Sequence, residues 1–260
     1  PAPPPSPPPS HAPQLQTVSR RSEHTHHIAP SVQVVIIAPT NSLQFPWLCQ
    51  LMGSAIEFNV WQRKHNELPI IPIFAGHTAV ADYISAYGEH SLQPNGYMVV
   101  PPGKSKKSHA ATKYVATWRI FNETQAQWVV AVDPDTMLQP LSFANAASVL
   151  QTWERQRVVI ASNLTGTLHG NFPKWESKQA KMDAACKAVG LPLVVGFPFW
   201  NDAPAYSRYD FSEFAGLLLS RGYDFMNFEY RGGFPWDHLA YLCYKVHRQG
   251  WSVRHIDYPA

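Results

Sequence analysis

The chain has 260 residues and a mass of 29.2 kDa, which is enough for one large domain or two small ones with a sizeable core. Hydrophobic residues make up 45% and charged residues 15% of it, which excludes a wholly disordered polyelectrolyte. No apolar run approaches the roughly 18–20 residues of a membrane span. The basic residues (21) nearly balance the acidic ones (18), and the pI is about 8.8. A nucleic-acid-binding protein would show a higher pI and a clustered basic face, so no nucleic-acid partner is expected.

Residues 1–30 differ in composition from the rest of the chain. They open with PAPPPSPPPSHAP, which lacks large apolar residues and favours an extended polyproline II-like spacer. We interpret residues 1–30 as a disordered stalk or linker and residues 31–260 as a catalytic domain. In a secretory enzyme such a stalk would separate the domain from a membrane anchor that precedes this sequence. The prolines also suit an SH3-type ligand. Three histidines cluster in this region: His24, His26 and His27. Such a cluster either binds a metal ion or is simply part of a solvated segment.

From residue 31 onward, apolar β-branched runs alternate with segments of helical periodicity. Strands are expected at Val32–Ala38, Pro69–Ala75, Tyr97–Val100, Trp128–Val132, Val158–Ala161, Leu193–Val195 and Trp251–Ile256. Helices are expected at Leu48–Ile56, Thr78–Tyr87, Ala111–Trp118, Ser142–Arg155, Glu176–Val189, Phe211–Ser220 and Trp236–Gln249. Repeated strand–helix units with short connections predict an α/β fold whose mostly parallel central sheet carries helices on both faces.

The three cysteines are widely spaced and include no CxxC pair. Cys49, Cys186 and Cys243 each lie in an apolar helical pattern, which is typical of buried thiols. One disulfide with one free thiol is the other arrangement that this spacing allows.

The most informative motif is the acidic turn that follows the strand expected at Trp128–Val132. Asp133 and Asp135 flank Pro134 at the carboxyl end of that strand, which is where parallel sheets bind their ligands. Two carboxylates at such a place repel each other unless a cation lies between them. Mn²⁺ or Mg²⁺ would suit them and could hold a diphosphate. A solvated surface turn is the alternative interpretation.

A hydrophobic strand that ends in Asp-x-Asp, in such an α/β chain, resembles the nucleotide-sugar-dependent glycosyltransferases of the GT-A fold, a Rossmann-like fold. The resemblance implies a hexosyltransferase that moves a sugar from a nucleoside-diphosphate sugar to a hydroxyl acceptor on a glycan, a protein or a lipid. It also implies that Asp135 binds the metal directly, and that Asp133 contacts the ribose or a metal-bound water.

A second resemblance lies near the end of the chain. Residues 234–256 (FPWDHLAYLCYKVHRQGWSVRHI) resemble the acidic pair, helix, glycine and strand of inverting GT-A enzymes. Asp237 then corresponds to the catalytic base, although Trp236 stands where the family commonly has an acid. An aspartate in the first turn of a helix also simply suits the helix dipole. His255 resembles a late third metal ligand by its location, and a hydrogen-bonded structural histidine is the alternative.

Further donor and acceptor residues are implied by the same resemblance. Thr40 and Asn41 follow the first expected strand, where GT-A proteins contact the nucleoside, and His77 follows the second. Lys113 would approach the donor diphosphate. An aromatic-rich loop at residues 196–210 is expected to bind the acceptor through Trp200, Asn201, Asp202 and Tyr206. An irregular packed loop is the competing interpretation of this segment.

Two other functions fit parts of the sequence. Haloacid dehalogenase-like phosphoryl-transfer enzymes also place Asp-x-Asp after a buried strand, but there the motif lies in the first strand and a Thr lies two residues beyond the second Asp. In this chain Thr136 follows Asp135 directly. The other alternative is a non-catalytic module that binds carbohydrate or sugar nucleotides. Sequons at Asn122 and Asn163 allow N-glycosylation, which would accompany a location in the secretory pathway or Golgi lumen.

Overall fold

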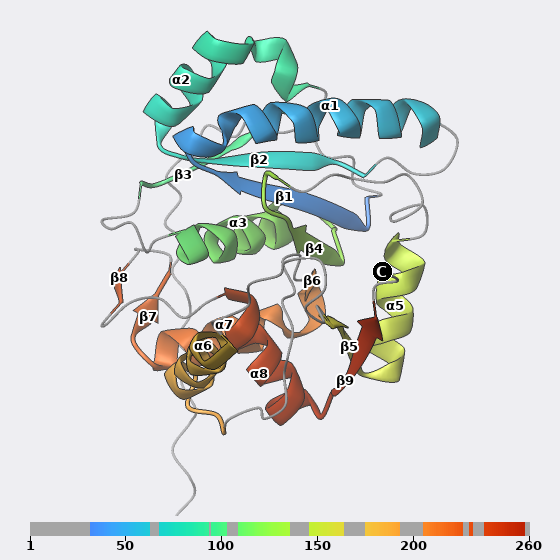
Figure 1. The fold of residues 1–260 in the computed structure, drawn as a ribbon, viewed down its shortest axis with the longest axis vertical. Coiled ribbons are helices and arrows are strands. Elements are labelled where there is room, and N and C mark those ends of the chain that lie inside the picture. The colour runs from blue at the N-terminus through green and yellow to red at the C-terminus, as the bar shows by residue number, and fades with distance from the viewer. Residues whose placement is uncertain are drawn as a thin grey trace, which may run out of the picture.

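The computed structural model describes residues 32–62, 68–93, 95–102, 109–135, 146–163, 175–192, 205–225, 229–230 and 237–257 (Figure 1). The stalk expected at residues 1–30, the strand expected at Leu193–Val195 and the acceptor candidates Trp200, Asn201 and Asp202 lie outside these ranges. Within the described ranges, no helix is both long and apolar enough to span a bilayer.

A five-stranded sheet in the order β3-β2-β1-β4-β6 forms the centre of the fold (Figure 1). β1 (Val34–Thr40) runs parallel to β2 (Ile70–Ala75) on one side and to β4 (Trp128–Ala131) on the other. β3 (Met98–Val100) extends the parallel pairing beyond β2, whereas β6 (Ala205–Ser207) is antiparallel to β4. This topology confirms the predicted α/β fold with a mostly parallel sheet.

β1 is the strand from which the chain winds in both directions. The chain passes from β1 outward through β2 to β3, and then returns to place β4 on the opposite side of β1. All seven residues of β1 are buried, as expected for an apolar strand with both faces covered. The strand order therefore reverses between β1 and β4, and open α/β sheets bind ligands at such a switch point.

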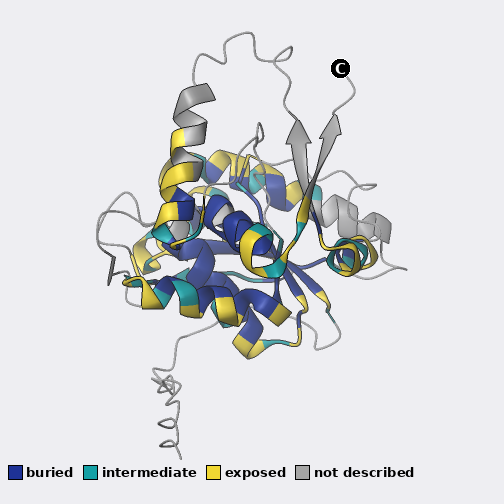
Figure 2. Cartoon of the chain, turned by 90° about the horizontal axis from the view of Figure 1, so that it is seen from below, coloured by how far each residue is buried: buried dark blue, intermediate teal, exposed yellow. Residues whose placement is uncertain are grey.

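Two hydrophobic clusters cover the two faces of the sheet. One face of β1 packs through Val35 and Ile37 against α3 (His109–Glu123), α7 (Arg208–Ser220) and α8 (Asp237–Gln249). The other face packs through Val34, Ile36 and Ala38 against α1 (Phe45–Gln62), α2 (His77–Tyr87) and α5 (Ala146–Gln156). Figure 2 shows the buried strands in dark blue and the exposed residues on the outer faces of the helices.

Two short 3₁₀ helices lie in the connections between the larger elements. The 3₁₀ helix η1 (Ser42–Gln44) joins β1 to α1, and η2 (Glu89–Leu92) follows α2. α2 begins at His77, one residue before the expected Thr78, because Gly76 leaves β2 with a positive φ of 93°. That backbone conformation favours glycine over residues that carry a Cβ.

The later strands do not all join the central sheet. β5 (Val158–Asn163) and β9 (Ser252–Asp257) pair in parallel with each other as a separate two-stranded sheet. A short antiparallel pair forms between β7 (Tyr223–Asp224) and β8 (Glu229–Tyr230). The sequence therefore located β5 and β9 but did not specify their pairing.

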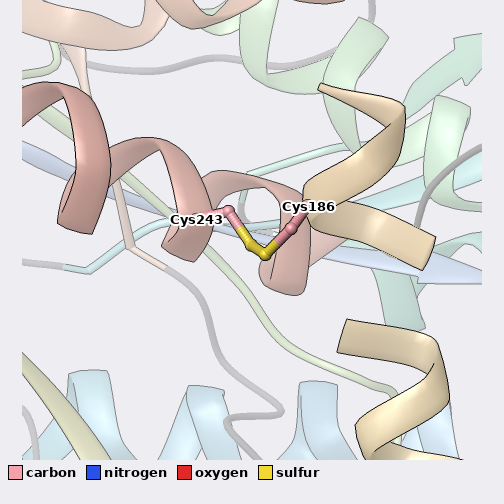
Figure 3. Close-up of a disulfide and its surroundings, with 2 residues drawn as sticks. All are labelled: Cys186 and Cys243. Carbon is pink, nitrogen blue, oxygen red and sulfur yellow. A yellow bond between two sulfur atoms is a disulfide. The ribbon is translucent and has the colours of Figure 1, made fainter. Parts of the chain in front are cut away.

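A disulfide between Cys186 and Cys243 joins α6 (Trp175–Ala188) to α8 (Figure 3). Cys49 in α1 is a free, half-buried thiol. Of the two arrangements that the cysteine spacing allowed, the structure has one disulfide and one free thiol. Because α8 starts at Asp237, the bridge anchors the helix that carries the candidate base.

Candidate functional site

The carboxyl ends of the four parallel strands meet at one edge of the sheet. Thr40 at the end of β1 pairs with Phe74 near the end of β2, and Ala75 pairs with Val100 of β3. On the other side of β1, the β4 ladder ends with Ile37 opposite Ala131. Val132, the residue that follows β4, still donates its backbone N–H to the Ile37 carbonyl at 2.9 Å. Asp133 thus directly follows the last backbone hydrogen bond between this segment and β1.

The three residues of the acidic turn differ in their exposure. Asp133 is half-buried, Pro134 is buried and Asp135 is exposed. Val132 in front of them is fully buried. The buried valine and proline fix the backbone on both sides of Asp133, while Asp135 remains open to solvent. The acidic motif therefore lies at the surface of the switch point between β1 and β4.

Lys113 of α3 forms an ion pair with Asp133. Its Nζ lies 3.2 Å from Oδ1 of Asp133, and the exposed fractions of the two side chains are 6% and 34%. α3 packs against the sheet through the residues that surround Lys113: Ala111, Tyr114, Val115 and Ala116 are all buried. An ammonium in such surroundings is costly unless an anion compensates it. The lysine reaches the acidic turn from the protein interior.

This ion pair changes how the charge at the acidic turn is balanced. The sequence predicted that repulsion between the two aspartates would be relieved by a metal ion. In the structure the charge of Asp133 is balanced by Lys113, a cation of the protein itself. The sequence predicted Lys113 and Asp133 separately as donor-binding residues. It contained no signal of their contact, because the rest of α3 and the whole of β4 lie between them in the chain.

A divalent cation still fits the chemistry of the turn. A carboxylate has two oxygens with several acceptor sites, so one contact from Lys113 does not exhaust Asp133. Asp135 adds a second, exposed carboxylate, and carboxylate oxygens are preferred ligands of Mg²⁺ and Mn²⁺. Within the described ranges no group of three or more His, Cys, Asp or Glu residues surrounds a common point. Water molecules or a bound phosphate would supply further ligands, as is usual for Mg²⁺.

Thr40 is the last residue of β1, and Asn41 follows it at the same edge of the sheet. Thr40 is buried, and its hydroxyl lies 3.4 Å from the Asn41 carbonyl. The Asn41 side chain caps η1: its Oδ1 accepts from the Leu43 N–H at 3.0 Å, and its Nδ2 donates to Gln44 Oε1 at 2.6 Å. Asn41 thereby fixes the turn from β1 into α1, so the structure gives it a capping contact as well as a position beside the predicted nucleoside site.

The remaining predicted site residues are distributed over different elements. His77 is exposed at the first residue of α2, immediately beyond the end of β2. Asp237 is the first residue of α8, and His255 lies in β9 opposite Ala161. The side chains of Asp237 and His255 fall outside the part of the structure that is described, so their roles stay predictions.

Tyr206 is the one acceptor candidate that the structure describes, and it lies in the core. It is 0% exposed in β6, and its ring packs against Tyr114, Phe211 and Tyr241 at centroid distances of 6.0, 5.4 and 4.8 Å. A fully buried ring cannot stack on a sugar, so the predicted acceptor contact of Tyr206 is wrong. The alternation of a strand, with Tyr206 facing the core, is the physical reason.

Arg208 also has a structural role next to β6. Its guanidinium donates to the carbonyls of Phe121, Thr124 and Ala126 at 2.6–2.7 Å. These carbonyls belong to the end of α3 and to the loop behind it. Arg208 thus compensates the carboxyl-terminal end of α3, the helix that presents Lys113.

Comparison with known proteins gave structural similarities only. No protein-family model matches the chain, and no curated protein matches it. Among solved structures, a CMP-2-keto-3-deoxy-manno-octonic acid synthetase complexed with CTP is 10% identical with a TM-score of 0.41. The match covers 88% of this chain and 90% of that one.

Two further structural matches are described as sugar transferases. A glycosyltransferase involved in glycosylation of the major capsid of PBCV-1 is 8% identical with a TM-score of 0.43, covering 87% of this chain and 81% of that one. Mouse xyloside xylosyltransferase 1 is 9% identical with a TM-score of 0.43, covering 87% of this chain and 85% of that one. These scores are too low to assign an activity.

Proposed function

We propose that this protein is a metal-dependent glycosyltransferase of the GT-A type, which transfers a sugar from a nucleoside-diphosphate sugar to a hydroxyl acceptor. The observation that carries the proposal is the position of the acidic turn. Asp133 and Asp135 follow β4 at the carboxyl edge of the parallel sheet, beside β1, where the strand order reverses. Sheets of this type bind nucleotides at that point.

The residues at the switch point suit an anionic donor. Asp133 and Asp135 would hold Mn²⁺ or Mg²⁺, which when bound neutralises negative charge on the departing diphosphate. Lys113 adds a protein cation next to them. Thr40, Asn41 and His77 lie along the same edge and would contact the nucleoside. His255 would be a third metal ligand.

The acceptor side of the proposal depends on α8. Asp237 at the first residue of this helix would accept the proton of the acceptor hydroxyl as the new carbon–oxygen bond forms, which corresponds to an inverting transfer. Trp200, Asn201 and Asp202 would contact a glycan, protein or lipid acceptor. We propose that the enzyme acts in the lumen of the secretory pathway or Golgi. The Cys186–Cys243 disulfide supports an oxidising compartment.

Calorimetry with nucleotide and metal tests the donor site. UDP, GDP and their sugars are titrated into the protein with Mn²⁺ and with excess chelator. We expect one of these nucleotides to bind in the presence of Mn²⁺ and to lose most of its affinity with chelator. Asp135→Ala should abolish the metal-dependent part. Asp82→Ala removes an exposed carboxylate of α2 and serves as the matched control, which should bind as the wild type does.

The same variants separate the proposal from its alternatives. Equal nucleotide affinity in Asp135→Ala and the wild type would remove the metal site from the acidic turn. Hydrolysis of a generic aryl phosphate without transfer of a sugar would instead support a phosphoryl-transfer enzyme. Metal-dependent binding without hydrolysis or transfer of any sugar nucleotide would indicate a non-catalytic module.

A further inference from the structure

We propose that Asn122 carries an N-linked glycan, and that the glycan is attached before α3 packs against the residues that follow β6, because this packing closes the tripeptide that directs the modification. The sequence contains two Asn-x-Thr tripeptides, and the one at Asn122 lies wholly within the described ranges. The other begins at Asn163, the last residue of β5, and continues beyond them. The inference rests on the proposed location in the secretory pathway, but not on the proposed sugar transfer.

The position of Asn122 leaves room for a large substituent. Asn122 is the second-to-last residue of α3, and it is exposed together with Glu123 and Gln125. An oligosaccharide is bulky and strongly hydrated, so it is tolerated at a surface position of this kind. A glycan on Nδ2 of Asn122 would extend into solvent without displacing the buried residues of α3.

Asn122 lies at the edge of the sheet opposite the acidic turn. The N–H groups of Gln127 and Trp128 both donate to the Gln33 carbonyl, at 2.7 and 3.0 Å, so α3 ends beside the start of β1. Figure 1 shows α3 running alongside β1. Asn122 follows Lys113 by nine positions, which is about 14 Å along a helix. The glycan would therefore stand where residues 1–30 lead into the domain, and it would leave the donor edge open.

Thr124, the third residue of the tripeptide, is engaged by the folded domain. Its hydroxyl donates to the Ile120 carbonyl at 2.7 Å and accepts from the Ala126 N–H at 3.1 Å. Its carbonyl accepts from the Arg208 guanidinium at 2.7 Å. An enzyme that recognises Asn-x-Thr must contact this hydroxyl and the backbone around it. In the folded protein that enzyme would have to break several of these hydrogen bonds.

The contact that closes the tripeptide forms late. Arg208 follows Thr124 by 84 positions, so the growing chain presents the tripeptide before Arg208 has been synthesised. A helix of 15 residues is only marginally stable without its packing partners. The nascent chain therefore offers Asn122 and Thr124 in an open form, and folding later fixes them in the turn after α3.

The modification is a transfer from an oligosaccharide linked to a polyprenyl diphosphate. The amide nitrogen Nδ2 of Asn122 forms a bond to the anomeric carbon of the first sugar. The bond from this carbon to the diphosphate oxygen breaks, and the polyprenyl diphosphate leaves with the electron pair. The amide gives up one of its two protons to a base of the transferase. This chain contributes only the tripeptide.

Peptide mass spectrometry tests the site. The full chain is secreted from eukaryotic cells behind a cleavable signal, and its peptides are analysed before and after treatment with peptide N-glycosidase. We expect the peptide that contains Asn122 to carry an oligosaccharide. Asn122→Gln should abolish it, whereas Thr124→Ser keeps the signal and should retain it. Asn163→Gln removes the other tripeptide and is the matched control, which should leave the Asn122 glycan in place. An unmodified Asn122 in the secreted wild type would overturn the proposal.

A second experiment tests the timing. Folded, glycan-free protein from the bacterial periplasm and a synthetic peptide of residues 118–128 are each incubated with oligosaccharyltransferase and its lipid-linked donor. The peptide should be modified, and the folded protein should not. Arg208→Ala should raise modification of the folded protein by about tenfold or more, the equivalent of one hydrogen bond to a charged group. Arg155→Ala removes an exposed arginine of α5 and should change nothing. Equal modification of peptide and folded wild type would show that folding does not close the tripeptide.

Nucleotide binding separates this inference from the proposed function. Asn122→Gln should bind UDP or GDP with Mn²⁺ as the glycosylated wild type does, since Asn122 and the acidic turn lie at opposite edges. A changed affinity would contradict the placement of the glycan. If Asn122 is glycosylated but the wild type binds neither nucleotide, the proposed function fails and this inference stands. Nucleotide binding by a secreted protein with an unmodified Asn122 would give the reverse result.

Discussion

Lys245 of α8 and Asp210 of α7 form an ion pair inside the protein, with side-chain exposures of only 5% and 2%. The ammonium of Lys245 donates to Oδ2 of Asp210, and Tyr241 donates its hydroxyl to Oδ1 at 2.7 Å. Lys245 also lies 3.8 Å from the centroid of the Trp251 ring. The pair joins α7 to α8, the helix whose first residue is Asp237, and so it helps to position the candidate base.

Removing one member of this pair should destabilise the protein strongly. Lys245→Met leaves the Asp210 carboxylate buried without its cation, which typically costs about 3–5 kcal/mol. Chemical denaturation monitored by circular dichroism measures the loss. The double variant Lys245→Met/Asp210→Leu should recover much of it, because no buried charge then remains unpaired. A double variant as unstable as the single one would show that the loss comes from packing.

Asp237→Asn tests the assignment of the catalytic base. The amide cannot accept a proton, so transfer should slow by about 10²–10⁴-fold. Asparagine is nearly as good as aspartate at a helix start, so α8 should stay intact. Donor affinity measured by calorimetry should change little. A parallel collapse of donor binding would contradict the role of Asp237 as a base.

The disulfide should contribute substantially to stability. It links residues 57 positions apart, and in the chain-entropy model closing a loop of that length is worth about 4 kcal/mol. Cys186→Ala/Cys243→Ala should lose an amount of this order in denaturant titrations under oxidising conditions. Cys49→Ala is the matched control, because Cys49 forms no disulfide. Mass spectrometry after alkylation should find one free thiol in the wild type, and three alkylated cysteines would contradict the pairing.

Stability should fall at strongly alkaline pH, in part through Tyr83. Burial raises the pKa of Tyr83 to about 12, from 10.0. Below pH 10 the phenol is neutral in both states and its contribution is fully present. As the pH rises from 10 toward 12, the unfolded state loses this proton first, so the folded state loses relative stability. Thermal unfolding at pH 9–12 should show a shallower decline in Tyr83→Phe than in the wild type, and equal declines would exclude this contribution.

The local pattern of the chain predicted much of the fold. The apolar β-branched runs at β1, β2 and β4 and the helical periodicity around them correctly indicated a parallel sheet with helices on both faces. The acidic turn was placed at the carboxyl end of β4 for the same reason, because Asp133 directly follows an apolar run whose short length and β-branched residues favour a buried strand. Contacts between distant segments were not predictable in this way, as β5 and β9 show by pairing outside the central sheet.

The sequence by itself located β1 to β5 and β9 and showed that two carboxylates follow β4, because burial of apolar side chains imposes a local periodicity; it did not predict β6, β7 or β8. Only the tertiary structure decided that Cys186 pairs with Cys243, that Tyr206 lies in the core and that Lys113 neutralises Asp133. Each of these depends on which helix packs against which face of the sheet. The residues of these pairs are 20 or more positions apart and meet only through that packing, so their spacing in the sequence does not predict the contact.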